Sequence, residues 1–546
     1  MLSRPRQPLS RFAARRIVQR GQAALILLGV LVAGSGYVLL SSLNTASLAA
    51  ERSQITSDAL RQAKEALIAY AVSDDNRPGS LPCPDVNNDG WSKLEDYSGT
   101  NCVALVGRLP WRSLGLGDLR DGSGERLWYA ISNDFRSNAP MSTAPGTPLN
   151  SNTAGALTVT GTLAASQVVA IVFAPGPVLI REGASTQQQR GDGVCAGPPF
   201  TTTPACDPVN YLDIASSIDN ADGSSAFVAA DASNTFNDRL VLIVADDVFP
   251  AVEIRAAREL GVRLQQHYSA WAGAALVTNP RGWYPWAAPF STPNVAYAGA
   301  NDQKWGLAPF SDSAVAWTSP TITDIDGSRS CTINGKVLEC DATAASGGFT
   351  ISARVNNVAT AFIAPPDAGL VAVAFGSVAG APAASWTLNS AARALDVTVT
   401  GTFSSAGPHR ITVARPGVPA WADISAAWTS TTPHWLVKNN WHHSLYYGVS
   451  EGFSIQGTAA CGGGFLPLCL QVDNVTSGAH SVVVAMGRPI PARVADAGVC
   501  PSPSAEGCYL EGQNAVLGPG ADEGLRFEYN RRAGQFNDYA SVVAGN

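Results

Sequence analysis

The first 72 residues change from basic to apolar to amphipathic. Six arginines and no acidic residue lie before Gly21, and no charged residue occurs between Gln22 and Ala50. Ala23–Leu43 is almost wholly apolar, and a helix needs about 20 such residues to cross a bilayer. Because basic residues favour the cytoplasmic side, we expect one membrane span at 22–45 with the rest of the chain outside.

Beyond the span the pattern becomes that of an amphipathic helix. Apolar residues recur at helical spacing between charged ones, at Ile55, Ala59, Ala63, Leu67 and Tyr70 or Ala71. No Gly or Pro lies between Tyr37 and Arg77, so nothing breaks the helix as it leaves the membrane. We expect one helix over 22–72, roughly 75 Å long at 1.5 Å per residue.

Three interpretations of this segment are open. A cleaved secretory signal has a shorter apolar stretch of about 7–15 residues followed by small residues, which Ser47–Ala50 would supply. An uncleaved signal anchor is the simplest alternative. The third interpretation takes the whole basic leader and long helix together.

Arg20–Gly21–Gln22 at the start of this helix resembles the processing site of the type IV pilin and type II secretion pseudopilin superfamily. The resemblance implies that a prepilin peptidase cuts between Gly21 and Gln22. It also implies a single-pass inner-membrane precursor with a periplasmic body, which then joins a filament or the cell surface through other pilin or pseudopilin subunits and an assembly platform. Ile26 departs from the family, which usually has Glu at the fifth mature position; this departure occurs in some minor subunits at filament tips.

The chain also resembles itself at long spacing, and each matched block occurs in the same order in both copies. The pairs are Leu127–Phe135 with Leu445–Phe453, Val168–Ala174 with Ser481–Met486, Asn210–Asp213 with Cys508–Glu511, and Phe236–Asp238 with Phe536–Asp538. A predicted helix precedes each copy, the second at Ala251–Trp271. We therefore expect two copies of a helix laid on an antiparallel sheet, an α+β fold. The order also resembles large pilin-like proteins that pair Leu-Pro-Cys-Pro-Asp, here from Leu81, with a later Phe-Asn-Asp.

A β-rich insertion interrupts the second copy between about 301 and 432. Short β-type runs are separated by Gly, Pro, Asn and Ser, at Val315–Trp317, Thr321–Ile325, Phe349–Val355, Ala359–Ala364, Leu370–Phe375, Ala384–Leu388, Leu395–Thr400 and His409–Val413. This spacing is typical of a β-sandwich. The insertion is either a surface for an outside ligand, still unknown, or an inert spacer.

Cysteine usage and charge fit an exported protein. Ten cysteines fall into five close pairs, which predict disulfides in an oxidising compartment: Cys83/Cys102, Cys195/Cys206, Cys331/Cys340, Cys461/Cys469 and Cys500/Cys508. The net charge of −7 argues against nucleic-acid binding, which requires a basic face.

The segment Asp85–Asp96 has the spacing of a calcium loop. Oxygen ligands occupy loop positions 1, 3 and 5, Gly occupies position 6, and an acid occupies position 12; the candidate ligands are Asp85, Asn87, Asp89, Trp91 (through its carbonyl) and Asp96. Asp96 replaces the usual Glu, and Pro82 and Pro84 exclude a helix before the loop. The alternative is an Asn/Asp/Gly turn without metal.

The sequence contains no His-Glu-x-x-His, Gly-x-Ser-x-Gly or Walker motif. His434, His442 and His443 cluster beside tryptophans, where a polar strand entrance is favoured over a metal site. We expect a protein that is not an enzyme but a minor pilin or pseudopilin, with the filament tip as one candidate position. The expected parts are a leader (1–21), a long helix (22–72), a first unit (73–248), a second helix and start of a second unit (249–300), the insertion (301–432) and the remaining second unit (433–546). The alternative is a membrane-anchored, adhesin-like binding protein that does not polymerise.

Overall fold

The computed structural model describes residues 47–545 with internal gaps. The gaps are 100, 138–146, 273–283, 286, 289, 291–302, 310–314, 325–328, 335–336, 345–346, 358–371, 376–382, 390–393, 404–406, 415–433, 454–459, 462–468, 474, 490–508, 511–513, 515–525 and 528–535. Within the insertion, strands and their pairing are described. Arg20, Gly21, Gln22 and the predicted span at 22–45 lie outside the described residues.

The first unit is a six-stranded sheet in which β6 is central. Its strand order is β3-β4-β6-β5-β9, and β10 also pairs with β6. The only parallel pair among these strands is β5 with β9. The strands are β3 (Val106–Arg108), β4 (Trp128–Ile131), β5 (Leu157–Gly161), β6 (Ala165–Ala174), β9 (Ala226–Ala229) and β10 (Arg239–Val244).

The second unit has a six-stranded sheet with the same connections. Its order is β11-β20-β22-β21-β23, β24 also pairs with the central β22, and β21 with β23 is the parallel pair. The strands are β11 (Trp305–Leu307), β20 (Leu445–Val449), β21 (Leu470–Val472), β22 (Thr476–Ala485), β23 (Arg526–Phe527) and β24 (Tyr539–Gly545). Two of the matched sequence blocks thus supply corresponding strands: Leu127–Phe135 and Leu445–Phe453 contain β4 and β20, and Val168–Ala174 and Ser481–Met486 contain parts of β6 and β22.

Polar contacts directly after β4 and β20 correspond as well. The Ser132 hydroxyl accepts a hydrogen bond from the Ala156 N–H at 2.9 Å, and the Ser450 hydroxyl accepts one from the Leu470 N–H at the same distance. Both serines follow an aromatic-rich strand, β4 or β20. The likeness between the two halves therefore extends from strand order to individual side chains.

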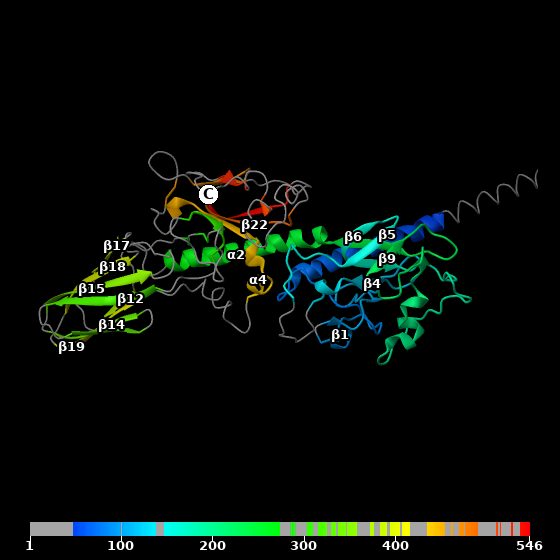
Figure 1. Ribbon diagram of the computed structural model, residues 1–546, viewed down its shortest axis with the longest axis horizontal. Coiled ribbons are helices and arrows are strands. Elements are labelled where there is room, and N and C mark those ends of the chain that lie inside the picture. Colours follow the sequence, from blue (N-terminus) through cyan, green and yellow to red (C-terminus); the bar gives the residue numbers. More distant parts are fainter. Residues whose placement is uncertain are drawn as a thin grey trace, which may run out of the picture.

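Two helices pack on these sheets and share one core. The N-terminal helix is described over residues 47–73, and α2 (Ala245–Ala272) runs from the first sheet toward the second in Figure 1. α2 contacts β6 and β10 of the first sheet and β22 and β24 of the second. Buried residues of both helices and both sheets form a single apolar cluster. Lys64 of the N-terminal helix donates to Asp247 of α2 at 2.9 Å, which joins the two helices at the first turn of α2.

The predicted apolar face of the N-terminal helix needs one correction. Ala59, Ala63, Leu67 and Ala71 are buried, and Tyr70 is half-buried. Ile55 is 45% exposed, because the helix turns the adjacent Thr56 toward the first unit instead: Thr56 is buried and its hydroxyl accepts from the Gly122 N–H at 3.0 Å. The four buried positions keep the predicted i, i+4 spacing, whereas Ile55 faces solvent.

The insertion forms two four-stranded antiparallel sheets at one end of the molecule (Figure 1). One has the order β12-β15-β18-β17 and the other β13-β14-β19-β16. Their strands are β12 (Val315–Asp324), β13 (Arg329–Asn334), β14 (Val337–Ala344), β15 (Gly347–Asn357), β16 (Ala372–Phe375), β17 (Ala383–Asn389), β18 (Ala394–Phe403) and β19 (Gly407–Ala414). The first two predicted runs, from Val315 and from Thr321, belong to one strand, β12. Its pairing with β15 shifts register between Thr318 and Thr321. The sequence pattern missed the β13–β14 hairpin, and Ala359–Ala364 lies outside the described residues.

Short elements complete the described chain. Two-stranded sheets pair β1 (Tyr97–Ser98) with β2 (Asn101–Cys102) and β7 (Ile214–Ala215) with β8 (Ile218–Asp219). The short helices are η1 (Leu94–Asp96), η2 (Asn133–Phe135), η3 (Phe200–Thr202), η4 (Pro204–Cys206), η5 (Pro208–Asn210), α4 (Trp435–Lys438), η6 (Trp441–His443) and η7 (Glu451–Phe453). Among the described residues, no helix is both long enough and apolar enough to span a membrane.

Three predicted disulfides are present: Cys83–Cys102, Cys195–Cys206 and Cys461–Cys469. Cys331 and Cys340 occupy directly opposite positions in the β13–β14 hairpin. Cys500 and Cys508 lie outside the described residues. Each disulfide that is present links residues fewer than 20 apart, so it fastens a local loop rather than distant elements.

Candidate functional site

The predicted calcium loop lies at one edge of the first sheet. Asp85 pairs with Arg108 of the edge strand β3 through two main-chain hydrogen bonds, of 3.0 and 2.9 Å. The Cys83–Cys102 disulfide closes the loop from outside. The main-chain bonds and the disulfide therefore hold both ends of the segment without a ligand.

Two residues give the loop its tight turn. Asn88 and Gly90 adopt left-handed backbone conformations, with φ of 64° and 88°. A Cβ on Gly90 would lie 2.7 Å from the Trp111 ring, so a larger residue would clash there as well as strain the backbone. Glycine at loop position 6 is thus required by both conformation and space.

The two terminal carboxylates hold the loop by accepting main-chain hydrogen bonds. Asp85 accepts from the N–H groups of Asn87 at 3.1 Å, Asp89 at 3.3 Å and Gly90 at 2.7 Å. Asp96 accepts from Val86 at 3.0 Å. It also accepts from the Lys93 N–H at 2.6 Å. The acids at positions 1 and 12 therefore converge on the same backbone.

The intermediate positions continue this pattern. Asn87 accepts from the Asp89 N–H at 3.1 Å, and its side-chain amide donates to Glu95 at 2.7 Å. Asp89 accepts from the Trp91 N–H at 2.8 Å and forms an ion pair with Lys93. Glu95, which the sequence analysis did not single out, is thus part of the loop.

The carboxylates at the two ends are buried. Asp85 and Asp96 are each 1% exposed, and neither forms an ion pair with a described residue. Burial raises the pKa of Asp85, the hydrogen bond from Gly90 lowers it, and the carboxylates of Asp96 and Asp89 add to the rise, so that the pKa is about 7. Burial likewise raises the pKa of Asp96 to about 6. A negative charge held here without a cation is costly, so the donor set fits a hard divalent cation.

No three His, Cys, Asp or Glu side chains in the described part of the chain are arranged to hold a metal ion. Asp85, Asp89 and Asp96 therefore do not form a preassembled metal site. To hold a cation, their carboxylates would have to move closer together, and the Asn87 side chain and the Trp91 carbonyl would supply the further oxygens. Oxygen ligands of this mixed kind are those that calcium takes in proteins.

The histidine cluster lies at the entrance to β20. The rings of His442 and His443 are 4.0 Å apart, and burial lowers their pKa values to about 3 and about 4. His434 caps α4 by accepting from the Leu436 N–H at 3.3 Å, and it lies 3.1 Å from Glu259. This arrangement builds the turn that precedes the strand.

The two Phe-Asn-Asp blocks form equivalent hydrogen bonds to the main chain of a neighbouring loop. Asn237 donates to the Pro177 carbonyl at 2.7 Å, and Asn537 donates to the Arg488 carbonyl at 2.8 Å. Burial raises the pKa of Asp238 well above its usual range, and the neighbouring Asp213 carboxylate adds to this effect. The repeated motif thus fixes loop backbone near the end of each central strand.

Arg108 is a buried residue that the sequence analysis missed. Its guanidinium lies 3.9 Å from the centre of the Tyr211 ring and 4.4 Å from that of Trp128, and it donates to the Ala205 carbonyl at 2.9 Å. Burial lowers its pKa to about 10. Arg108 therefore joins β3 to the loop closed by Cys195–Cys206, a contact between residues nearly 100 positions apart that no local pattern predicts.

Comparison of the chain with protein-family models, with curated proteins and with solved structures finds no match.

Proposed function

We propose that this protein is a minor pilin or pseudopilin that assembles through its N-terminal helix into a type IV pilus or a type II secretion filament. The observation that carries the proposal is the exposed start of this helix. Leu48 and Ile55, seven residues apart and hence on one face, are 51% and 45% exposed. They directly follow the apolar stretch at 22–46. Such a face suits the helix of a neighbouring subunit.

The paired sheets support the same proposal. Each is a mainly antiparallel sheet packed on a long helix, which resembles the plan of a pilin headgroup. Two units with one strand order fit a duplicated headgroup within a single subunit. Ile26, in place of the family's usual Glu, favours a position at the filament tip, where one fewer neighbour must be accommodated.

The insertion favours a second function, an adhesin-like binding protein that stays anchored in the membrane. Two four-stranded sheets at the end of the molecule offer a separate surface, and β12 approaches β13 and β14 of the other sheet as in a sandwich. In a tip subunit this surface would be displayed outward. In an anchored protein it would act without a filament.

We also propose that the Asp85–Asp96 loop binds one calcium ion. Asp85, Asp89 and Asp96 would supply carboxylate oxygens, with Asn87 and the Trp91 carbonyl completing the ligands. The bound cation would neutralise the buried carboxylates and stiffen the loop. Its role is structural, consistent with a headgroup that must survive outside the cell.

The mature N-terminus separates these possibilities. Full-length protein is produced with and without a prepilin peptidase, and its N-terminus is determined by mass spectrometry. We expect a start at Gln22 in the presence of the peptidase. An intact Met1 under both conditions would favour the anchored binding protein, and a start near Glu51 would exclude both, because the helix would have been removed on export.

A further inference from the structure

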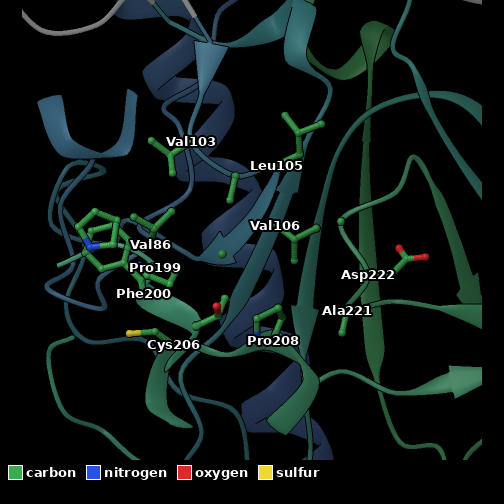
Figure 2. Close-up of a pocket in the computed structure, with 15 residues that line it drawn as sticks. Val86, Val103, Leu105, Val106, Pro199, Phe200, Cys206, Pro208, Ala221 and Asp222 are labelled. Carbon is green, nitrogen blue, oxygen red and sulfur yellow. The ribbon is translucent and has the colours of Figure 1, made fainter. Parts of the chain in front are cut away.

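An apolar cavity of about 700 Å³ runs along the outer edge of β3 in the first unit. Five consecutive residues, 103–107, line one side of it. Phe200, Cys206 and Pro208 form another wall, and Ala221 and Asp222 close the rim (Figure 2). The Cys195–Cys206 disulfide holds the wall that contains Cys206. The cavity therefore lies between a sheet edge and a covalently fastened loop.

This edge has main-chain N–H and C=O groups without a hydrogen-bond partner among the described residues. β3 is the terminal strand of its sheet. Toward β4, hydrogen bonds join Leu105 with Ile131 and Leu109 with Leu127. In an antiparallel ladder the alternate residue Val106 must then turn its N–H and C=O away from β4.

On its outer side β3 is paired with another segment at one end only. Asp85 forms main-chain hydrogen bonds with Arg108, but the outward N–H and C=O groups of Ala104 and Val106 have no partner among the described residues. Val106 is only 6% exposed, and both residues line the cavity. Unpaired main-chain groups in a mainly apolar cavity favour a ligand that brings its own N–H and C=O groups.

The second unit closes the corresponding edge by itself. By the paired bridges Asp85–Arg108 and Ala288–Leu307, Trp305 of β11 corresponds to Val106. The side-chain amide of Gln303 donates to the Trp305 carbonyl at 2.5 Å, and the Gln303 carbonyl accepts from Ala287 at 2.9 Å. In the second unit a side chain of the same chain thus binds the Trp305 carbonyl of β11. In the first unit the corresponding residue, Val106 of β3, lines a cavity.

The charge at the rim limits the kind of ligand. Asp222 lines the cavity and forms no ion pair with a described residue. Asp207, between the lining residues Cys206 and Pro208, caps η5 but is likewise without a cationic partner in the described chain. A ligand with a basic group next to its apolar part would complement both carboxylates.

We propose that this cavity binds an extended peptide segment of a partner protein, with alternating apolar side chains and a flanking basic residue, which adds a strand to the outer edge of β3. The segment would pair with the N–H and C=O groups of Val106 and Ala104. Its apolar side chains would enter between Phe200 and Val103, and its basic residue would approach Asp222. The site does not depend on filament assembly.

The test uses full-length protein in detergent and a fluorescein-labelled heptapeptide of alternating valine and threonine flanked by lysine. Two further probes carry N-methyl groups on one or the other set of alternate amides. We expect saturable binding by fluorescence anisotropy, a loss of about tenfold or more for one methylated probe, and little loss for the other, because only one edge of a strand faces β3. Equal binding of all three probes, or no saturable binding, would overturn the proposal.

Variants locate the site independently. Val106→Pro removes the outward N–H and leaves the bonds to β4, which come from the adjacent residues, although it also replaces a buried valine side chain. Phe200→Ala removes one wall, and Asp222→Asn removes the rim charge. Each should weaken binding, whereas Val475→Ala, an exposed valine of the second unit, should not. Hydrogen exchange should show protection of the 103–107 segment by the parent probe. Binding that is unchanged in Phe200→Ala and Asp222→Asn, or displaced by octylamine without any effect of N-methylation, would refute a strand-binding site.

Discussion

Asp85 concentrates the chemistry of the candidate loop in one side chain. It accepts three main-chain hydrogen bonds, yet burial still raises its pKa to about 7, because the hydrogen bonds do not replace the lost water. Asparagine in its place would keep one acceptor oxygen but lose the charge. The residue therefore distinguishes a turn held by hydrogen bonds from a turn that also binds a cation.

Calcium should stabilise the wild-type protein and not the Asp85→Asn variant. A ligand at one hundred times its Kd stabilises the folded state by about 2.7 kcal/mol, which raises the unfolding temperature by several degrees. We expect this rise when calcium replaces EGTA in thermal unfolding of the wild type. Asp118→Asn, outside the loop, should retain the rise despite losing contacts with Arg120 and Arg126. No difference between calcium and EGTA in the wild type would show that the loop is only a turn.

At the scale of elements, what the sequence could predict depended on how local each determinant is. The positions of the loop residues follow from spacing within 12 residues, and the buried face of α2 at Val252, Ala256 and Leu260 follows from helical periodicity. The exposure of Ile55 depends on a contact with Gly122 that buries the adjacent Thr56 instead, and the stacking of Arg108 on Tyr211 depends on a distant segment. Neither leaves a periodic signal. The pairing of β10 with β6 is equally non-local. In the second unit β24 pairs with β22 in the same way.

The two faces of the N-terminal helix should respond differently to truncation. Leu67 is fully buried, and Leu67→Ala should lower the free energy of unfolding by about 2–5 kcal/mol. Exposed Ile55→Ala should change it by less than about 0.5 kcal/mol. Denaturant unfolding of the full chain measures both. If the exposed face contacts a neighbouring subunit, Ile55→Ala should nevertheless reduce co-purification with partner pilins, and normal co-purification would argue against that contact.

For the whole molecule, the main question is whether the insertion takes part in filament assembly or is a separate domain displayed by the second unit. The chain enters the insertion after β11 and leaves it before α4. Leu307 of β11 and Leu436 of α4 are both fully buried in the core shared by the two units. The Ala308 N–H also bonds to the Leu445 carbonyl at 3.0 Å. The second unit therefore holds both ends of the insertion through contacts of its own.

Replacing residues 315–414 with a Gly/Ser linker of about 15 residues, whose root-mean-square reach is about 20 Å, should leave the shared core intact. We expect unchanged unfolding of the remaining units, processing at Gln22 and incorporation into filaments, because the residues that carry these properties lie outside the deleted segment. Binding of the cells to surfaces should fall if the insertion displays a binding face. Thermal unfolding, mass spectrometry and filament purification measure the first three, and adhesion assays measure the last. A well-folded deletion variant that is processed but fails to enter filaments would place the insertion in the assembly interface and contradict its assignment as a displayed domain.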